Sequence, residues 1–151
     1  MKKIKFLLIL FSLFIGVTTY AQKNKADDIV GKWFTENNEA KVEIYKIGDK
    51  YYGKIVWLKE PNDKETAKPS KDKKNPDVKL RERAIIGMNF VNGFKFDGDE
   101  KWEDGTVYDA KSGKTYNGYI AFESKDKLKL RGYIGKSWMG LGRTTYWIRS
   151  N

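Results

Sequence analysis

Apolar and polar residues alternate along most of the chain after residue 30, and turn-forming residues interrupt the alternation at short intervals. A two-residue period is typical of β-strands with one buried face, and no stretch shows the 3.6-residue period of an amphipathic helix. The pattern therefore predicts an all-β domain. Strands are expected at 31–36, 40–47, 50–58, 84–91, 100–103, 106–109, 114–123, 127–134 and 142–149, with a short tenth strand at 94–96.

Three hairpins have registers that separate apolar from polar residues. They turn at Gly48-Asp49, at Asp104-Gly105 and at 124–126. With the loop 110–113, these turns predict the pairs Glu43–Lys54, Tyr45–Tyr52, Val42–Ile55, Ala40–Trp57, Trp102–Val107, Asp109–Lys114, Phe122–Leu128, Ile120–Leu130, Glu123–Lys127, Tyr119–Arg131 and Gly118–Gly132. Facing glycines indicate a sharp bend or a group that presses on the backbone.

An open sheet of this size would expose two long edges, whereas closure removes them. The chain is therefore predicted to form a single antiparallel up-and-down β-barrel of about eight to ten strands. The strand count must be even for the last strand to run antiparallel to the first.

Residues 59–83 form a long connection, unlike the short turns between the other expected strands. They hold all three prolines, nine basic and six acidic residues. We expect a long, solvated and mobile loop, which acts either as a flap or docking arm or is an insertion without a role.

The first 21 residues have the features of a secretory signal peptide. Lys2, Lys3 and Lys5 precede the apolar run 6–17, and Thr19-Tyr20-Ala21 provides a cleavage site after Ala21. The run is shorter than the about 20 residues that span a bilayer. The sequence predicts export to the periplasm or the cell exterior, one domain over 22–151, and no transmembrane segment after cleavage.

The chain contains no cysteine and no histidine. These absences exclude Ser-His-Asp and Cys-His catalysis, imidazole or thiolate zinc sites, and disulfides. The remaining carboxylates could serve a glycosidase or, at 97–100, a calcium site, but Asp97 and Asp104 have turn roles beside glycine and Asp109 has Lys114 as its partner. We therefore expect a non-enzymatic protein without cofactor or metal.

Positive charge is concentrated near the C-terminus. The formal net charge of +10 falls to +7 without the three lysines of the signal segment, and six basic but no acidic residues occur from Lys127 onward. The bias indicates either a solvated face or affinity for an anionic envelope component, and nucleic acid is not expected as a partner.

Two sets of residues resemble known families. Gly31-Lys32-Trp33 resembles the Gly-x-Trp of the lipocalins and wider calycins, which implies that Trp33 packs at one barrel end under an arginine from the last strand, here Arg149. The stretches WEDGTVYDAKSGKTY (102–116), LKLRGYIG (128–135) and LGRTTYWIR (141–149) are similar to the exported bacterial family DUF2147, apart from Ala110 in place of an expected proline. The resemblance implies a small lipocalin-like barrel without an established activity.

The aromatic residues favour binding of a small apolar or amphipathic molecule inside the barrel, unless their side chains fill the interior. The loop 135–141 should lie at the open mouth, as a guard or as a plug, opposite the Trp33–Arg149 end. The candidate ligand-binding residues are Trp57, Trp102, Tyr133, Trp138, Met139, Leu141 and Arg143. The alternative is an envelope interaction module that binds a polyanion or a protein through its basic C-terminal strands.

Overall fold

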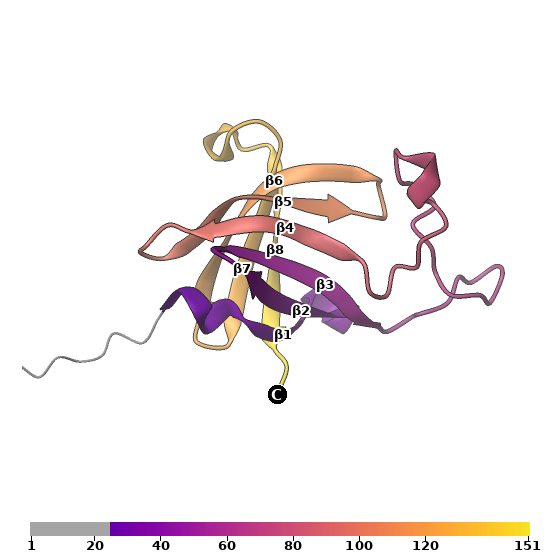
Figure 1. Ribbon diagram of the computed structural model, residues 1–151, viewed down its shortest axis with the longest axis horizontal. Coiled ribbons are helices and arrows are strands. Elements are labelled where there is room, and N and C mark those ends of the chain that lie inside the picture. The colour runs from indigo at the N-terminus through magenta and orange to yellow at the C-terminus, as the bar shows by residue number, and fades with distance from the viewer. Residues whose placement is uncertain (1–24) are drawn as a thin grey trace, which may run out of the picture.

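The computed structural model describes residues 25–151 and shows a closed barrel of eight antiparallel strands in up-and-down order (Figure 1). The strands are β1 (Gly31–Phe34), β2 (Ala40–Ile47), β3 (Lys50–Leu58), β4 (Asn89–Phe96), β5 (Lys101–Asp109), β6 (Lys114–Ser124), β7 (Lys127–Tyr133) and β8 (Gly142–Arg149). The predicted all-β barrel is confirmed. The predicted signal peptide, residues 1–21, lies outside the described residues.

Short 3-10 helices lie before and between the strands: η1 (Lys25–Ile29), η2 (Glu36–Asn38), η3 (Val78–Leu80) and η4 (Ser137–Met139). Across residues 25–151, no helix has the length and apolar character needed to cross a membrane.

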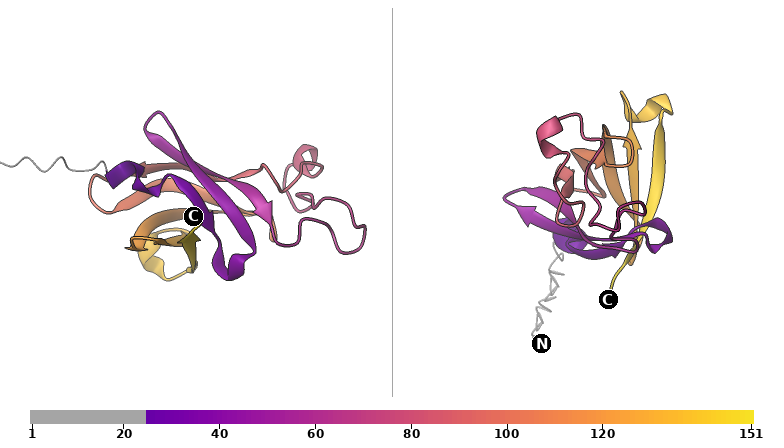
Figure 2. Two further views of the ribbon diagram at one scale, coloured as in Figure 1. Left: turned by 90° about the horizontal axis from the view of Figure 1, so that it is seen from below. Right: turned by 90° about the vertical axis from the view of Figure 1, so that its right-hand side faces the viewer.

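The up-and-down order sorts the connections onto two barrel ends. We call one the closed end: it carries η1, the β2–β3, β4–β5 and β6–β7 turns and the end of β8. We call the other the loop end: it carries η2, residues 59–88, the 110–113 turn and the 134–141 loop. Residues 59–88 extend from the barrel on the side away from η1 (Figures 1 and 2).

Aromatic side chains fill much of the barrel interior. Trp33, Trp102, Trp147, Tyr51 and Phe94 are the largest of the fully buried side chains. The Trp102 ring meets Tyr51 edge-on at 6.2 Å between ring centroids. Because burial of one large apolar side chain is worth about 1.5–3 kcal/mol, this cluster is a main source of stability in a chain without disulfides.

The β2–β3 hairpin has the predicted register over most of its length. The pairs Glu43–Lys54, Tyr45–Tyr52 and Val42–Ile55 are confirmed, with a 2.9 Å ion pair in the first and stacked rings in the second. The predicted pair Ala40–Trp57 is wrong. A bulge shifts the register between Lys41 and Val42 and sets Trp57 opposite Lys41.

The predicted turn at Asp104-Gly105 is wrong. Strand β5 runs through it, with a bulge between Trp102 and Gly105, so the expected strands 100–103 and 106–109 are one strand. Trp102 consequently pairs with Ile120 rather than Val107. Asp104 has a φ of 61°, and a left-handed residue serves a bulge as well as a turn.

Strand β4 also replaces two predicted elements. It begins at Asn89 rather than at residue 84 and includes residues 94–96, which were expected as a separate tenth strand. Gly93 lies inside this strand with a φ of 72°. The strand count is therefore eight.

The β6–β7 hairpin confirms Phe122–Leu128, Ile120–Leu130, Tyr119–Arg131 and Gly118–Gly132, and β5 with β6 confirms Asp109–Lys114. The pair Glu123–Lys127 is wrong, because an irregularity after Phe122 sets Ser124 opposite Lys127. A Cβ on Gly118 would lie 3.0 Å from Arg131 O and 3.2 Å from the Phe94 ring, whereas one on Gly132 would lie 3.5 Å from Tyr116 Cβ. Phe94 also presses on Gly105, where a Cβ would lie 2.3 Å from its ring.

Residues 59–88, which we call the arm, include the long loop predicted at 59–83. Most of its residues are exposed, but two of its polar side chains, Asp72 and Asn75, are buried. Asp72 is fully buried and accepts hydrogen bonds from Tyr108 Oη at 2.6 Å and Asn75 Nδ2 at 2.7 Å. Arg83 Nη2 lies 2.7 Å from the same carboxylate, and Asp72 N donates to the Arg83 carbonyl at 3.0 Å. A Cβ on Gly113 would lie 2.0 Å from Lys74 O, so the 110–113 turn packs against the arm.

Candidate ligand-binding site at the closed barrel end

Arg149 closes one end of the barrel over a buried tryptophan. Its guanidinium carbon lies 4.1 Å from the Trp33 ring centroid, as the resemblance to lipocalins implies. Nη2 donates to the Asp28 carbonyl at 2.9 Å and Nε to the Asp126 carboxylate at 3.2 Å. Trp33 is fully buried and donates from Nε1 to the Ile29 carbonyl at 2.9 Å. The charge is thus held by an aromatic face, a carbonyl and a carboxylate.

The glycine of Gly31-Lys32-Trp33 has a local reason. Gly31 has a φ of 137°, a conformation that residues with a Cβ rarely adopt. A Cβ at this position would also lie 3.4 Å from Arg149 Nη1. The motif therefore provides backbone freedom and room for the guanidinium next to the tryptophan that it covers.

Helix η1 is fixed across the closed end. Trp102 Nε1 donates to the Ala26 carbonyl at 3.0 Å. Asp27 accepts hydrogen bonds from Lys46 Nζ at 2.7 Å and Tyr51 Oη at 2.6 Å, and these bonds lower its pKa. Burial and the bond to Asp27 raise the pKa of Tyr51. The segment before β1 is therefore part of the cover over the closed end.

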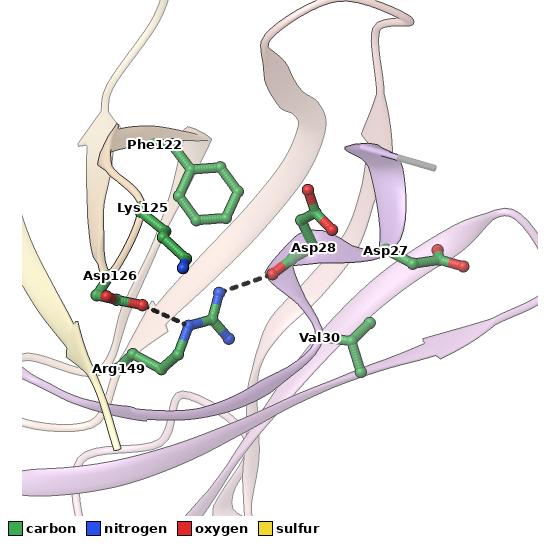
Figure 3. Close-up of a pocket in the computed structure, with 7 residues that line it drawn as sticks. All are labelled: Asp27, Asp28, Val30, Phe122, Lys125, Asp126 and Arg149. Carbon is green, nitrogen blue, oxygen red and sulfur yellow. Dashed lines mark hydrogen bonds and ion pairs between the residues drawn. The ribbon is translucent and has the colours of Figure 1, made fainter. Parts of the chain in front are cut away.

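A recess of about 670 Å³ opens between η1 and the β6–β7 turn. Figure 3 shows Lys125 pointing into it between Phe122 and Arg149. The lining residues are Asp27, Asp28, Val30, Phe122, Lys125, Asp126 and Arg149. A second recess of about 330 Å³ shares Asp28 and Phe122 with the first and also touches Phe96, Asp99, Glu100, Trp102 and Ala121. The larger volume lies in the range of small-molecule pockets, about 300–1,000 Å³.

The structure separates the residues that the sequence analysis grouped as one ligand site. Trp102 is buried at the closed end and lines the smaller recess. Trp57 lies on the outer wall instead of the interior, 42% exposed and edge-on to Phe34, because the bulge turns it outward. Tyr133, partly buried at the end of β7, alternates with the inward-facing Leu128 and Leu130 and so also faces outward.

The other four predicted residues lie at the loop end. Trp138, Met139 and Leu141 are exposed by 78%, 49% and 61%, so they are not an inward-folded plug. Arg143 is exposed as well and pairs in the sheet with Gly132. The structure brings none of these four residues to the recess.

Sequence reasoning missed Val30, Phe122, Lys125 and Asp126 as site residues. They come from two segments, the residue before β1 and the β6–β7 hairpin, which only barrel closure brings together. One signal was available for Asp126. An arginine at the end of the last strand requires an anionic partner, and the β6–β7 turn must share its barrel end.

The carboxylates of the described chain have mainly structural roles. Asp97 accepts hydrogen bonds from the backbone N–H groups of Asp99, Glu100 and Lys101, which lower its pKa. Asp109 accepts from Lys111 N at 2.9 Å. Within residues 25–151, no group of three or more acidic side chains is arranged to hold a metal ion.

The closed eight-stranded barrel, capped by an arginine over a first-strand tryptophan, defines a lipocalin-like fold. Residues 31–149 match the model of a family described as uncharacterized proteins conserved in bacteria, DUF2147, and the chain belongs to this family. A solved structure with a TM-score of 0.69 and 27% identity covers 81% of this chain and 82% of its own. It is described as protein HP1028 from the human pathogen Helicobacter pylori, belonging to the lipocalin family. The curated proteins contain no match.

Proposed function

We propose that the protein binds a small amphipathic molecule with an anionic head in the recess at the closed end. The observation that carries the proposal is the meeting of Phe122 and Val30 with Lys125 and Arg149 around a recess of about 670 Å³. The similarity to a lipocalin-family protein supports small-molecule binding as the general role.

The chemistry of the recess suggests how such a molecule would lie. An apolar chain would pack on Phe122 and Val30, which is 39% exposed and gains from being covered. An anionic head would meet Lys125, because Arg149 already contacts Asp126 and the Asp28 carbonyl. The carboxylates of the lining would repel a second negative charge, so a monoanion fits better than a dianion.

The test is a titration with octanoate, octanol and octylamine, followed by native mass spectrometry or calorimetry. Octanoate should bind most tightly, and Lys125→Glu should weaken its binding by about tenfold, since one charge-assisted hydrogen bond is replaced by repulsion. Lys114→Glu makes the same charge change at the loop end and should leave binding unchanged. Equal weakening in both variants, or no binding of octanoate, would contradict the proposal.

A second candidate function rests on the outer face of β7. Lys127, Lys129 and Arg131 alternate with the buried Leu128 and Leu130, so the three cations form an outward row. This row supports an interaction module that binds an anionic envelope component after export. Such binding should weaken steeply with salt, whereas ligand binding in the recess should respond much less.

A further inference from the structure

An apolar surface projects from the loop end, far from the recess. It consists of Ile134, Trp138, Met139 and Leu141 on the loop between β7 and β8, exposed by 58%, 78%, 49% and 61%. We call these four side chains the apolar tip. Figure 1 shows that the loop stands clear of the barrel beyond β7 and β8. Four large exposed apolar side chains within eight residues of one loop mark a contact surface rather than ordinary scatter.

The loop backbone has a defined shape that displays these side chains. Ile134 N donates to Leu141 O at 3.0 Å and closes the base of the loop, and Met139 N donates to Lys136 O at 3.0 Å within η4. Gly135 and Gly140 have φ values of 76° and 74°, which permit both reversals of direction. The tip is therefore held outward by its own hydrogen bonds.

The charges around the tip are mainly positive. Lys136 lies inside the loop and Arg143 lies just after it, and both are exposed. No acidic residue occurs from 127 to 151. On the β1–β2 connection of the same end, Glu39 is paired with Lys111 at 2.9 Å, and Glu36 accepts a hydrogen bond from Thr145.

We propose that the apolar tip inserts into the interfacial region of an anionic lipid surface. The tip is convex, and both recesses described above lie at the other barrel end, so a flat deformable surface suits it better than a protein partner that needs a matching pocket. An indole at the tip favours the membrane interface, where one side is apolar and the other is hydrated. Lys136 and Arg143 would lie at the depth of anionic headgroups. The inference is independent of the function proposed for the recess.

The experiment is co-sedimentation with vesicles of phosphatidylcholine alone and of equal parts phosphatidylcholine and phosphatidylglycerol. The processed chain is used, starting at Gln22 after the predicted cleavage, so that the apolar run 6–17 contributes to no sample. The protein should bind the mixed vesicles and bind pure phosphatidylcholine more weakly. Trp138→Ala should lower binding by about tenfold, which corresponds to the loss of one large interfacial side chain. Lys136→Glu with Arg143→Glu should abolish the preference for phosphatidylglycerol.

Trp57→Ala is the matched control, because Trp57 is also exposed but lies on the barrel wall. It should bind vesicles as the unaltered protein does. A brominated lipid should quench the fluorescence of Trp138 in a Trp57→Phe protein, and this readout does not depend on the stability of Trp138→Ala. The proposal is overturned if Trp138→Ala and Trp57→Ala bind equally, if neither vesicle binds the protein, or if the protein is a dimer that Trp138→Ala makes monomeric.

Discussion

Both ends of the barrel hold a charged side chain between a partner of opposite charge and an aromatic ring, as Arg149 and Asp72 illustrate. At the closed end the held charge is Arg149, over Trp33 and beside Asp126. At the loop end it is Asp72, bonded to Tyr108 and beside Arg83. The difference is access to solvent. The Arg149 side chain is 27% exposed and lines a recess, whereas the Asp72 side chain is completely buried.

This difference separates a charge that is accessible from solvent from one that is not. Asp72 has all its partners within the chain, and removal of any of them leaves a buried charge. Arg149 is partly exposed and lines the recess, so a molecule bound to Lys125 would lie beside it without disturbing its contacts with Trp33 and Asp126. The same residue types thus line the recess of the proposed binding site at one end and attach the arm at the other.

Asp72→Ala should have the largest effect on stability. It leaves Tyr108 Oη and the Arg83 guanidinium without their shared partner and should lower the free energy of unfolding by about 3–5 kcal/mol. Urea denaturation measures the loss, and limited proteolysis should cut first within 59–83. Glu82→Ala is the control, because the Glu82 side chain is 80% exposed and its pair with Lys71 contributes about 0–1 kcal/mol. Equal losses of unfolding free energy in the two variants would contradict the assignment of a buried, stabilising charge to Asp72 at the loop end.

Arg149→Ala should cost less, about 2 kcal/mol, from the cation over Trp33 and a partly exposed ion pair. Arg149→Lys should recover part of the loss, because an ammonium also attracts an indole face but lacks the fork that reaches Asp126 and the Asp28 carbonyl. Thermal unfolding measures both variants. Arg143→Ala, an exposed arginine of the same strand, should leave the midpoint unchanged.

Two tyrosines allow a direct comparison of the ends. Tyr108 Oη donates to Asp72 and Tyr51 Oη to Asp27, both at 2.6 Å. Tyr108→Phe should cost about 1–2 kcal/mol, because the buried carboxylate has no water to replace the hydroxyl. Tyr51→Phe should cost less, because the Asp27 side chain is 46% exposed and keeps Lys46. A larger loss in Tyr51→Phe would reverse the assignment of the buried, saturated site to the loop end.

The sequence carried enough information to predict the barrel and the long loop, but not how the arm is attached to the barrel. Alternation and turn residues act locally, and one register of each hairpin satisfies both faces, so most cross-strand pairs could be placed. The turn predicted at Asp104-Gly105 was wrong because a bulge and a turn need the same left-handed backbone conformation. The inward orientation predicted for Trp57 was wrong because one extra residue in a strand reverses the face of every later residue. Asp72 lies in a charged stretch that resembles a solvated loop, and its partner Tyr108 is 36 residues away.

The recess could not be predicted from the sequence for a related reason. The resemblance to lipocalins implied the contact of Arg149 with Trp33, and their places in the first and last strands of a closed sheet agree with it. Val30, Phe122 and Lys125 are single residues of ordinary type, and nothing in their neighbours indicates a pocket. Their proximity arises from the path of η1 across the closed end, which the alternation of strand residues does not describe.

A change of pH near neutrality should have the smallest effect on the free energy of unfolding. The hydrogen bonds to Asp72 outweigh the effect of its burial and lower its pKa, and the Lys73 bond lowers the pKa of Asp63 to about 2. A carboxyl with a lowered folded pKa adds stability above its usual value of 3.8 and loses it as pH falls toward the folded value. With no histidine in the chain, stability should be constant between about pH 5 and 8. Asp72 and Asp63 both belong to the arm. Below about pH 4, proteolysis at 59–83 should therefore precede any change in buried tryptophan fluorescence. At the closed end the carboxylates of Asp27 and Asp126 are 46% and 62% exposed, so their protonation should cost less stability than that of the buried Asp72, and Arg149 keeps its charge in contact with Trp33. A transition near pH 6, or loss of the closed end first, would contradict this order.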